Sequence, residues 1–522
     1  MKIYSFSPFG YEGNLVSVEV DIRRGIPAID IVGLADGAVK ESRERMKSAI
    51  RNSGFEFPCE RVLISLSPAD LKKEGAGFDL PVALGVLGAA GQGPDGEGQK
   101  DGGRALPDES VLVMGELELS GAIRPVRAVN AAAWTAAANG IKRCVVPRAN
   151  ALEAAEAPGM KVFGADNLRE AFSALFDDSR FSLAKEASDG DIPDGAEEVD
   201  GVLFMKAQAG SSFDEMYGQK TLLRACQIAA AGGHNLLAFG PPGCGKTLAL
   251  QSFPALLPFL TVDEARSVTR IYSIAGLIGA GQGLIRKPPF RQPHMSASLE
   301  GMCGGGSQCR PGEISLAHNG VLFLDEAAEF RGSALQMLRV PLESGSVTLS
   351  RAGRTAVYPA NFQLLMATNP CPCGNYGSEK KICLCSARSI ELYWKKFSSP
   401  LLDRVDLRVK VDIPEEGSQM KCICSANELR KGIAKAVKAQ RCRQSVKNAR
   451  LSPEETASFC VLSEEARERL DEAVLRHDFS PRAAAACKKI ARTIADMEGS
   501  EKIMGAHMAE AVDFRRVSGL LS

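Results

Sequence analysis

The 522-residue sequence has no excess charge of either sign, with 63 lysine and arginine residues against 63 aspartate and glutamate residues. So balanced a chain has no global field that would draw it to nucleic acid or membrane, and any polyanion site must be a local patch. It also lacks an apolar run of the roughly 18 residues that a membrane-spanning helix needs. Its first residues, MKIYSFSPFGYEG, do not join a charged segment to an apolar one as a signal peptide does. We therefore expect a cytoplasmic protein with no membrane partner.

Cysteine is plentiful, but the 15 cysteines are an odd number in a long chain without an export signal, which favours reduced thiols over disulfides. Four of them form two C-x-C pairs within CPCGNYGSEKKICLCS, namely Cys371, Cys373, Cys383 and Cys385. Four thiolates this close suit a tetrahedral Zn²⁺ site, although C-x-C is tighter than the usual spacing. Four reduced thiols are the alternative. Cys422 and Cys424 form a further C-x-C pair, to which we assign no role.

A chain of this length should hold about three domains. Residues 1–175 alternate strand-like and helix-like segments, which is typical of an α/β domain. Residues 176–212 include the acidic stretch EASDGDIPDGAEEVD and are predicted to be a solvated linker. Residues 213–415 carry the nucleotide motifs described below, and residues 416–522 are predicted to be a helical C-terminal lid.

Within the first of these domains the pattern predicts individual elements. Residues 38–52 have helical spacing, and residues 144–147 form a short apolar strand. The stretch VLVMGELELSGAIRPV is predicted to form a hairpin. Residues 91–109 are Gly-rich and polar, and we expect them to form a mobile surface loop.

The strongest motif is GPPGCGKT at residues 240–247, which matches G-x-x-x-x-G-K-[ST] at every position. An apolar run at residues 236–239 precedes it as a buried strand, and the residues after Lys246 can open a helix. Glycines let backbone N–H groups surround phosphates, Lys246 reaches the β- and γ-phosphates, and the Thr247 hydroxyl can bind Mg²⁺. The alternative is a glycine turn that happens to carry a lysine. We predict that ATP is bound by Gly240, Pro241, Pro242, Gly243, Cys244, Gly245, Lys246, Thr247 and Leu248.

Two further apolar strands end in polar residues. The first is VLFLDE, which places Asp325 and Glu326 at the strand end, where ligands bind in open α/β sheets. Asp325 would hold Mg²⁺ through water, and Glu326 would orient and polarise the attacking water. The second is LLMATN, which ends in Asn369. The arrangement resembles that of AAA+ ATPases, in which such an asparagine senses the γ-phosphate; a strand-end turn before Pro370 is the alternative.

Two arginines extend this resemblance. Arg404 lies in SPLLDRVD, where the arginine of the resembled class reaches a neighbouring subunit's nucleotide as an arginine finger. A salt bridge from Arg404 to Asp403 or Asp406 is the alternative. Arg482 opens a C-terminal helix and would approach the same nucleotide. If Arg404 is a finger, the working form is a ring, which we expect to contain six subunits.

The stretches VEVDIRRGIPAIDIVGLADGAVKESRERMKSAI and LSPADLKKEGAGFDLPVAL resemble the N-terminal domain of the ComM (YifB-like) family of magnesium-chelatase-related ATPases. That domain is similar in fold to the Lon protease domain, which is ribosomal S5 domain 2-like. A Ser-Lys dyad needs a hydroxyl nucleophile and a lysine base. The corresponding positions here fall at or beside Gly77 and at Asn130, neither of which can do this chemistry. We therefore expect an interaction module and not a peptidase.

The resemblance continues through RKPPFRQPH, GGGSQCRPGEISLAHNGVLFLDE, PLESGSVTLSRAG, YPANFQLLMATNPCPCG and ARTIADMEGSEKI. It implies a hexameric DNA helicase or translocase that drives branch migration of recombination intermediates during natural transformation. Departures are local: the family's paired histidines become His294-Met295, its Leu-Pro after the acidic pair becomes Ala327-Ala328, and residues 484–486 are alanines.

Positive charge gathers in three places where DNA could bind. Residues 347–357 are predicted to form a hairpin with Arg351 and Arg354 at its tip, and a Pro-rich insertion carries Arg286, Lys287 and Arg291. A few cations per subunit around a ring would support salt-sensitive, sequence-independent binding. Solvated loops are the alternative for each cluster. The basic residues 430–450 place Lys431, Lys435 and Lys438 on one helical face, which suits a subunit contact as well as DNA.

Two other classes of function remain open. One is a metal-chelatase motor that remodels a partner protein. The other is a regulatory ATPase that remodels proteins, for which an aromatic pore loop is expected and Phe290 is the only candidate.

Overall fold

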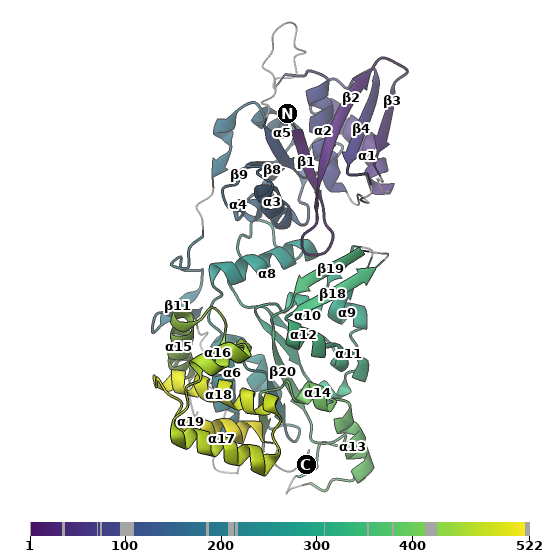
Figure 1. The fold of residues 1–522 in the computed structure, drawn as a ribbon. Coiled ribbons are helices and arrows are strands. Elements are labelled where there is room, and N and C mark those ends of the chain that lie inside the picture. The colour runs from purple at the N-terminus through teal and green to yellow at the C-terminus, as the bar shows by residue number, and fades with distance from the viewer. Residues whose placement is uncertain are drawn as a thin grey trace.

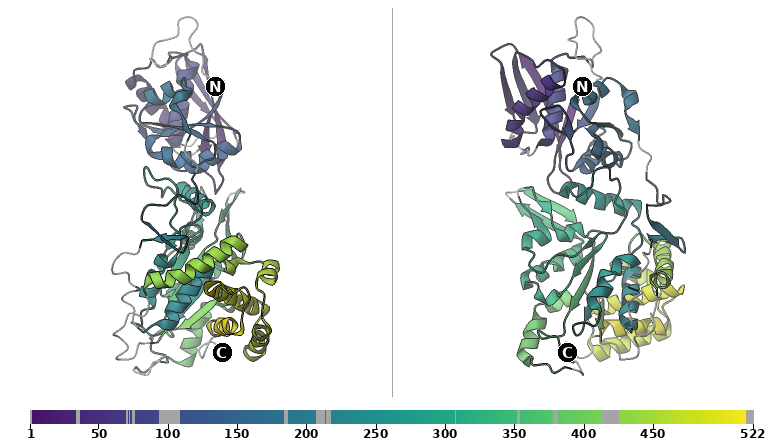
Figure 2. Two further views of the ribbon diagram at one scale, coloured as in Figure 1. Left: turned by 90° about the vertical axis from the view of Figure 1, so that its left-hand side faces the viewer. Right: turned by 180° about the vertical axis from the view of Figure 1, so that it is seen from behind.

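The computed structural model describes residues 2–516 apart from 34–36, 70, 72, 74–75, 94–108, 184–186, 207–212, 214–217, 307, 352–353, 378–380 and 413–424. The chain folds into an N-terminal unit stacked on a larger unit, as Figure 1 and the turned views of Figure 2 show. The larger unit carries the motifs predicted to bind ATP and is called the ATPase unit for that prediction. Most of the predicted loop at 91–109 and the Cys422 and Cys424 pair lie outside the described residues. None of the described helices is both long and apolar enough to cross a membrane.

The N-terminal unit is built on an eight-stranded sheet with the order β10-β9-β8-β5-β1-β2-β4-β3. Its strands are β1 (Lys2–Ser7), β2 (Asn14–Arg23), β3 (Ala28–Val32), β4 (Arg61–Ser67), β5 (Ser110–Val113), β8 (Arg143–Pro147), β9 (Lys161–Ala165) and β10 (Ser182–Leu183). Its helices are α1 (Gly37–Asn52), α2 (Asp79–Ala89), α3 (Val129–Ala138), α4 (Ala151–Ala155) and α5 (Leu168–Ala174). In β4, Val62, Ile64 and Leu66 alternate with more exposed residues because successive side chains of a strand point to opposite faces.

The predicted helix at 38–52 and strand at 144–147 are present as α1 and β8. The predicted hairpin is smaller than expected, since only β6 (Glu116–Leu117) and β7 (Ile123–Arg124) pair within it. Asn130 lies in the buried start of α3, where its side-chain amide donates to the carbonyl oxygen of Glu153 at 3.1 Å. The Asn130 side chain therefore helps to pack α3 against the segment that carries Glu153.

The ATPase unit contains a five-stranded sheet in the order β14-β17-β20-β13-β21, in which every neighbouring pair is parallel. Its strands are β14 (Phe290–Arg291), β17 (Val321–Leu324), β20 (Gln363–Thr368), β13 (Leu236–Phe239) and β21 (Leu407–Lys410). The predicted strands at 236–239 and 321–324 have the predicted limits, and all residues of both are buried. Because the strands are parallel, the polar residues after β13, β17 and β20 meet at one edge of the sheet.

Helices and short strands surround this sheet. The helices are α6 (Lys220–Gly232), α7 (Lys246–Gln251), α8 (Val262–Ala275), α9 (Leu299–Cys303), α10 (Glu313–Leu316), α11 (Gly332–Met337), α12 (Arg339–Ser344), α13 (Ala387–Lys395) and α14 (Ser399–Leu402). Two small hairpins are formed by β15 (Gly304–Gly305) with β16 (Arg310–Pro311), and by β18 (Ser346–Arg351) with β19 (Arg354–Pro359). The second of these is the hairpin that the sequence predicts at 347–357.

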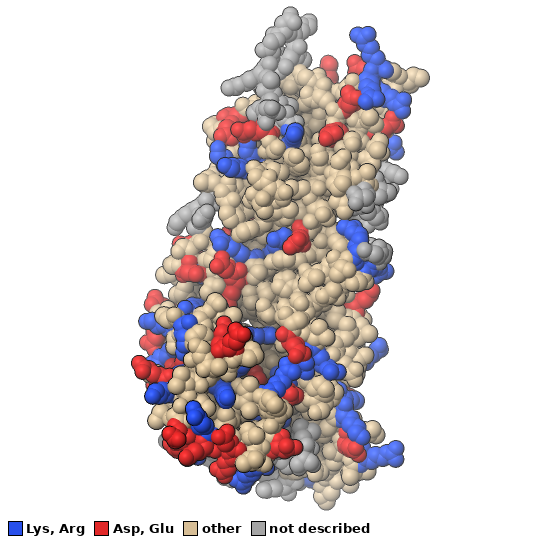
Figure 3. Space-filling view, viewed as in Figure 1, with Lys and Arg blue, Asp and Glu red and all other residues tan. Residues whose placement is uncertain are grey.

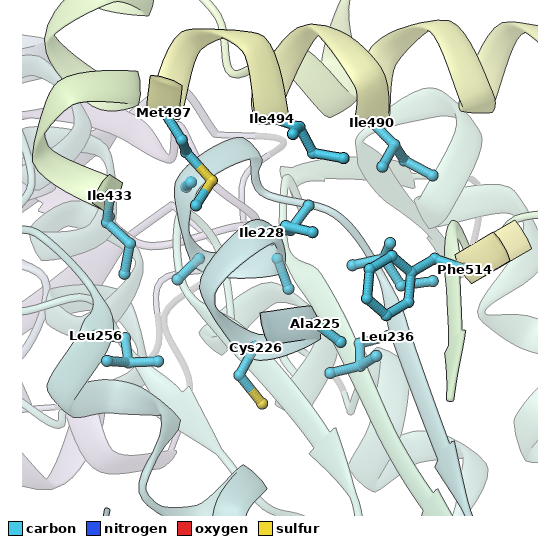
Figure 4. Packing of buried hydrophobic residues seen from close by; sticks show 14 of the residues in the cluster. Ala225, Cys226, Ile228, Leu236, Leu256, Ile433, Ile490, Ile494, Met497 and Phe514 are labelled. Atoms are coloured by element: carbon cyan, nitrogen blue, oxygen red, sulfur yellow. The ribbon is translucent and has the colours of Figure 1, made fainter. Parts of the chain in front are cut away.

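The C-terminal region is helical, with α15 (Ala426–Arg443), α16 (Pro453–Phe459), α17 (Glu464–His477), α18 (Pro481–Glu498) and α19 (Gly505–Arg515). Its helices pack against α6 and share one hydrophobic core with the sheet; Figure 4 shows Ile490, Ile494 and Met497 of α18 facing Ile228 of α6. Much of the basic stretch 430–450 is structural. Arg430 is buried and donates to the carbonyl oxygens of Ala255 and Met205, at 2.9 and 2.8 Å.

The acidic segment predicted to be a linker is partly ordered, which corrects that prediction. Residues of β11 (Ala196–Val199) pair with β12 (Val202–Met205), and Val202 and Phe204 are buried against the ATPase core. Arg430 lies 3.5 Å from Glu197 and over the Phe204 ring. The apolar VLFM run, which follows the acidic residues, supplies the burial energy that a solvated linker would lack.

The two units touch through α8 and the β18–β19 hairpin, which lie below the turn between β1 and β2 in Figure 1. Arg270 of α8 donates to the Tyr11 carbonyl oxygen at 2.9 Å and stacks on the Tyr11 ring. Phe9 and Tyr11 pack with buried Ala356 and Tyr358 of β19. The N-terminal unit is thus in direct contact with the predicted DNA-binding hairpin.

Candidate nucleotide-binding site

The loop between β13 and α7 has the backbone of a phosphate cradle. Gly243 and Gly245 have φ values of +80° and +87°, in the left-handed region that favours glycine. A side chain at Gly240 would place its Cβ only 2.0 Å from the Val411 carbonyl oxygen, so the strand end needs glycine there. These glycines let the chain turn tightly. Helix α7 then begins at Lys246, so the backbone N–H groups of its first turn, which have no partner within the helix, lie at the loop.

Lys246 is buried within this turn. Its Nζ donates to the carbonyl oxygens of Gly240 and Pro241, both at 2.8 Å. The amine therefore already lies among the backbone groups that surround a phosphate in such a loop, and phosphate oxygens would compete with these carbonyls for its protons.

Thr247 and Asp325 form the second part of the site. The Thr247 hydroxyl donates to Asp325 Oδ1 at 3.0 Å. The hydroxyl and the carboxylate thus lie side by side, as is needed if Thr247 binds Mg²⁺ directly and Asp325 holds it through water. A hydroxyl and a carboxylate are also the hard oxygen ligands that Mg²⁺ prefers.

Glu326 follows directly and has a positive φ of 48°, which is uncommon for a residue other than glycine. Its backbone N–H donates to Asp325 Oδ1 at 3.1 Å, and this bond holds the turn. Such strained residues gather at functional sites, where the surrounding structure fixes them. Glu326 lines the same cavity as Lys246.

A cavity of about 390 Å³ brings these groups together. Its lining residues are Pro242, Gly243, Gly245, Lys246, Thr247, Leu248, Asp325, Glu326, Ala367, Thr368 and Asn369. Asn369 follows β20 as predicted and reaches the cavity beside the acidic pair. The ends of three parallel strands thus supply a cation, two carboxylates and an amide to one space, as phosphoanhydride hydrolysis requires.

Arg404 and Arg482 are not among the lining residues of this cavity. Both instead contact Glu343 at the end of α12: Arg404 forms an ion pair with Glu343 Oε2, and Arg482 Nη2 lies 3.4 Å from Glu343 Oε1. The hydrogen bond from Arg404, followed by the charges of both guanidinium groups, lowers the pKa of Glu343. The sequence offered a salt bridge from Arg404 to Asp403 or Asp406 as the alternative to a finger. In the structure, Asp403 pairs with Arg515 at 2.8 Å and Asp406 with His234 at 3.3 Å, so the acidic partner of Arg404 is Glu343.

The Pro-rich insertion offers less positive charge than its sequence suggests. Arg291 forms a bidentate pair with Glu313, at 2.6 and 2.7 Å. Arg286 donates to the carbonyl oxygens of Leu260 and Ser188, at 2.9 and 3.2 Å. Both arginines are thus held by other parts of the chain, and a contact of either with DNA stays a prediction. Lys287 remains exposed.

Phe290 lies in β14 with its ring 5.9 Å from that of Phe323, between centroids, and packs against the main core. It is therefore a core residue and not the aromatic of a protein-gripping pore loop.

The arginine hairpin has two different sides. Arg351 and Arg354 stand opposite each other in the last pair of its register. The Arg351 side chain is 56% exposed and lies 3.6 Å from Glu300, which is itself largely exposed. Arg354 instead stacks on the Phe9 ring of the N-terminal unit, with Cζ 3.5 Å from the ring centroid. Of the two arginines predicted at the hairpin tip, Arg351 is therefore the more exposed.

Among the described residues on the face that Figure 3 shows, basic and acidic side chains are interspersed. Acidic residues are densest at the lower left, where Figure 1 places α17. On α15, Lys431, Lys435 and Lys438 remain exposed, as predicted for one helical face.

Sequence reasoning missed two residues that support the site. Gln219 is buried, and its amide donates to the carbonyl oxygens of Cys244 and Asp412, at 3.1 and 2.8 Å. It thereby ties the phosphate loop to the end of β21. Glu343 was missed as well. Its only sequence signal was its place in the stretch PLESGSVTLSRAG, directly before the hairpin.

The strand order, the phosphate loop and the polar strand ends define a P-loop ATPase of the AAA type. Three family models match the chain: "Subunit ChlI of Mg-chelatase" over residues 18–150, "Magnesium chelatase, subunit ChlI" over 212–420 and "Magnesium chelatase, subunit ChlI C-terminal" over 424–515. The chain belongs to this magnesium chelatase ChlI family and, within it, is homologous over its full length to proteins called YifB and ComM.

YifB of Escherichia coli is 37% identical over 523 residues, which cover 99% of this chain and 97% of that protein. Competence protein ComM of Haemophilus influenzae is 35% identical over 528 residues, covering 99% of this chain and 98% of that protein. The 38 kDa magnesium-chelatase subunit of Acidiphilium rubrum is 28% identical over 185 residues, covering 30% of this chain and 52% of that protein. Membership of this family implies ATPase activity.

Proposed function

We propose that this protein is an ATP-driven DNA motor of the ComM type, a ring of six subunits that promotes branch migration of recombination intermediates during natural transformation. The observation that carries the proposal is the exposed Arg351 at the tip of a hairpin that leads into β20, whose end lines the cavity. The full-length similarity to a competence protein supports it, whereas the alignment with the 38 kDa magnesium-chelatase subunit of Acidiphilium rubrum covers 30% of the chain.

ATP would bind with its phosphates in the loop at residues 240–247. Lys246 would turn from its carbonyl partners to the β- and γ-phosphates, while Thr247 and Asp325 would hold Mg²⁺, which neutralises phosphate charge when bound. Glu326 would orient the attacking water, and Asn369 would donate to the γ-phosphate. The burial of Lys246 and the strained turn at Glu326 support this division of roles, because the lysine and the Glu326 backbone are held in place before substrate arrives.

Hydrolysis would be completed between subunits. Arg404 and Arg482 do not line their own chain's cavity, and both are gathered on Glu343. A guanidinium group from the neighbouring subunit would spread the charge that develops on the γ-phosphate, as an arginine finger does. If both arginines act on the neighbouring subunit's nucleotide, their shared partner Glu343 can lie away from the phosphate loop of their own chain.

Motion would pass to DNA through β19 and β20, which are nearly consecutive. β19 ends at Pro359, and β20 begins at Gln363 and leads to Asn369 in the cavity. A shift of Asn369 on loss of the γ-phosphate would thus move the hairpin that carries Arg351. Exposed Lys287 would add to the positive lining of the central pore.

The N-terminal unit would act as an interaction module of Lon-like fold without peptidase residues. Its Phe9 holds Arg354 on one side of the hairpin. It would therefore influence how the hairpin meets DNA.

The test is an ATPase assay of the full chain without DNA, with single-stranded DNA and with forked DNA. We expect both DNAs to stimulate hydrolysis, and Arg351→Ala to abolish the stimulation. Arg467→Ala is the matched control, because Arg467 is an exposed arginine on α17, away from the hairpin. A chain that stays monomeric with ATP and shows no DNA affinity at low ionic strength would contradict the proposal.

A second candidate is a chelatase-like motor that remodels a partner protein. It shares the ATPase unit, and the similarity to the 38 kDa subunit of magnesium chelatase favours it. Such a motor would hydrolyse ATP at the same rate with and without DNA, so the same assay separates the two.

A further inference from the structure

Four cysteine sulfurs meet at the end of β20. The two C-x-C pairs, which are separated in sequence by a loop, bring Cys371, Cys373, Cys383 and Cys385 so close that their Sγ atoms all lie within 4.8 Å of one another. The Sγ atom of Cys371 lies 3.3 Å from that of Cys373 and 3.7 Å from that of Cys383, and the Cys373 and Cys383 sulfurs are 3.6 Å apart. These separations are far longer than the roughly 2.05 Å of a disulfide bond.

The same separations fit a tetrahedral metal site. Zn²⁺ binds thiolate sulfur at about 2.3 Å, so the sulfurs of a regular tetrahedron around it are about 3.8 Å apart. We propose that Cys371, Cys373, Cys383 and Cys385 bind one Zn²⁺ ion as a closed four-thiolate site, which fixes the end of β20 to the start of α13. With four protein ligands the ion has no open position, so its role is structural and not catalytic.

Groups around the sulfurs match those of a thiolate site. The Tyr376 backbone N–H donates to Cys371 Sγ at 3.3 Å, and the Asn375 backbone donates to Cys373. N–H donors to coordinating sulfurs orient the ligands and spread their negative charge. Gly374 lies between the donors and the first cysteine pair with a φ of +77°, so the chain turns sharply enough to direct both sulfurs inward.

The proposed site touches the nucleotide cavity from outside. A Cβ at Gly374 would lie 2.9 Å from Cδ of Pro242 in the phosphate loop and 3.9 Å from Cγ of Asn369. The turn that carries the first two cysteines therefore packs directly against the asparagine that lines the cavity.

The second cysteine pair leads into α13, whose N-terminal cap is Ser386. This helix returns to the same strand end. Trp394 Nε1 donates to the Pro370 carbonyl oxygen at 3.0 Å, and the Tyr393 and Thr368 hydroxyls lie 3.0 Å apart. The metal would close the open side of this arrangement and hold Asn369 between α13 and Pro242. The zinc site would thus support nucleotide binding by holding Asn369 in place. This role is independent of whether the motor acts on DNA or on a partner protein.

The test begins with the zinc content of the full-length protein purified under reducing conditions. We expect one Zn²⁺ per chain, and less than a tenth of that in Cys373→Ser/Cys385→Ser. The control is Cys442→Ser, because Cys442 is exposed and outside the cluster. Protein grown with Co²⁺ should show the absorption bands of tetrahedral cobalt with a thiolate-to-metal charge-transfer band, which the double variant should lack.

A second measurement remains informative if the double variant folds poorly. In the wild-type protein, a thiol reagent should release zinc together with modification of the four cysteines, after Cys442 has reacted. The affinity for a fluorescent ATP analogue should fall at least several-fold with zinc release. Wild-type protein that contains no zinc, takes up no Co²⁺ and exposes these thiols as freely as Cys442 would overturn the proposal, and DNA-stimulated hydrolysis by such a protein would leave the motor function standing.

Discussion

Arg404 and Arg482 share the carboxylate of Glu343, although one follows α14 in the ATPase unit and the other opens α18 in the lid. Glu343 lies in α12, and the arginine hairpin begins at Ser346 just after it. One acidic residue therefore connects the two arginines expected to act on a neighbour's nucleotide with the element expected to contact DNA.

Arg404→Ala should lower kcat for ATP hydrolysis by about 10³-fold, the smaller end of the range for arginine fingers, because charge on the transferred phosphate loses its partner. ATP binding should change little, since Arg404 does not line its own chain's cavity. The measurement is steady-state hydrolysis together with nucleotide titration.

Mixing gives the sharper form of this test. Arg404→Ala subunits keep an intact cavity, and Glu326→Gln subunits keep an intact arginine, so mixed rings should regain part of the activity that each variant alone lacks. If mixing restores nothing, while Arg467→Ala behaves as wild type, the arginine does not act between subunits.

Glu343→Gln should weaken both arginine contacts without removing either arginine. We expect a loss of about 10-fold in kcat, smaller than that of Arg404→Ala, because a neutral amide still accepts hydrogen bonds but lacks the negative charge that attracts both guanidinium groups. The same assay measures it, with Glu454→Gln as control, since Glu454 is an exposed carboxylate at the start of α16. A normal rate would show that Glu343 does not position the arginines.

Lys246→Ala and Glu326→Gln should fail at different steps. Without Lys246 the phosphates lose a charged ligand, so ATP affinity should fall by roughly 100-fold, at about 1.4 kcal/mol for each factor of ten. Glu326→Gln should still bind ATP but lose about 10²–10⁴-fold in hydrolysis, the usual contribution of a general base. Nucleotide titration and single-turnover hydrolysis separate the two, and equal binding by both variants would contradict the assigned roles.

Phe9→Ala should release Arg354 from the N-terminal unit. A cation–π contact of this kind contributes about 0.5–2 kcal/mol, so DNA affinity should rise by about 2- to 30-fold if freed Arg354 binds phosphate. Fluorescence anisotropy with single-stranded DNA measures this. Ile26→Ala is the control, because Ile26 is a largely exposed apolar residue of the same unit. A fall in affinity would mean that Phe9 presents Arg354 to DNA and does not withhold it.

His318 should make the ATPase unit sensitive to acid. Burial, followed by the charge of Arg450, lowers the pKa of His318 to about 4. Its Nδ1 accepts the Asn361 N–H at 3.0 Å, so the ring is neutral and Nε2 faces the Ser267 hydroxyl at 3.2 Å. Because the pKa of His318 is lower in the folded protein than in the unfolded chain, the unfolded chain is protonated first as pH falls. Stability is therefore complete above about pH 6.5 and is lost as pH falls toward 4.

Between pH 7 and pH 5 this residue should cost about 2 kcal/mol of unfolding free energy. His318→Gln should remove that part of the pH dependence in urea unfolding, while His294→Gln, at an exposed histidine, should not. Asp79 acts in the opposite direction, since burial raises its pKa to about 6 and acid favours its folded form. It is present in both proteins, so its effect cancels in the comparison. Parallel pH profiles for His318→Gln and wild type would contradict the assignment.

The sequence by itself determined the nucleotide site. The limits of β13 and β17 follow from continuous apolar runs, and GPPGCGKT, Asp325, Glu326 and Asn369 are read directly from the residues after such runs. Local patterns suffice here because parallel strands of one sheet must bring their carboxyl ends to the same edge.

Only the tertiary structure decided which charges are free. Arg291 and Arg351 look alike in sequence, but Glu313 holds the first at 2.6 Å in a partly buried pair, whereas the second is more exposed and lies 3.6 Å from exposed Glu300. A partner far along the chain leaves no local signal. The shared Glu343, the contact of Phe9 with Arg354 and the meeting of four sulfurs depend in the same way on the packing of distant segments. Spacing along the chain predicts which elements form, whereas the pairing of side chains between elements is fixed only when those elements pack.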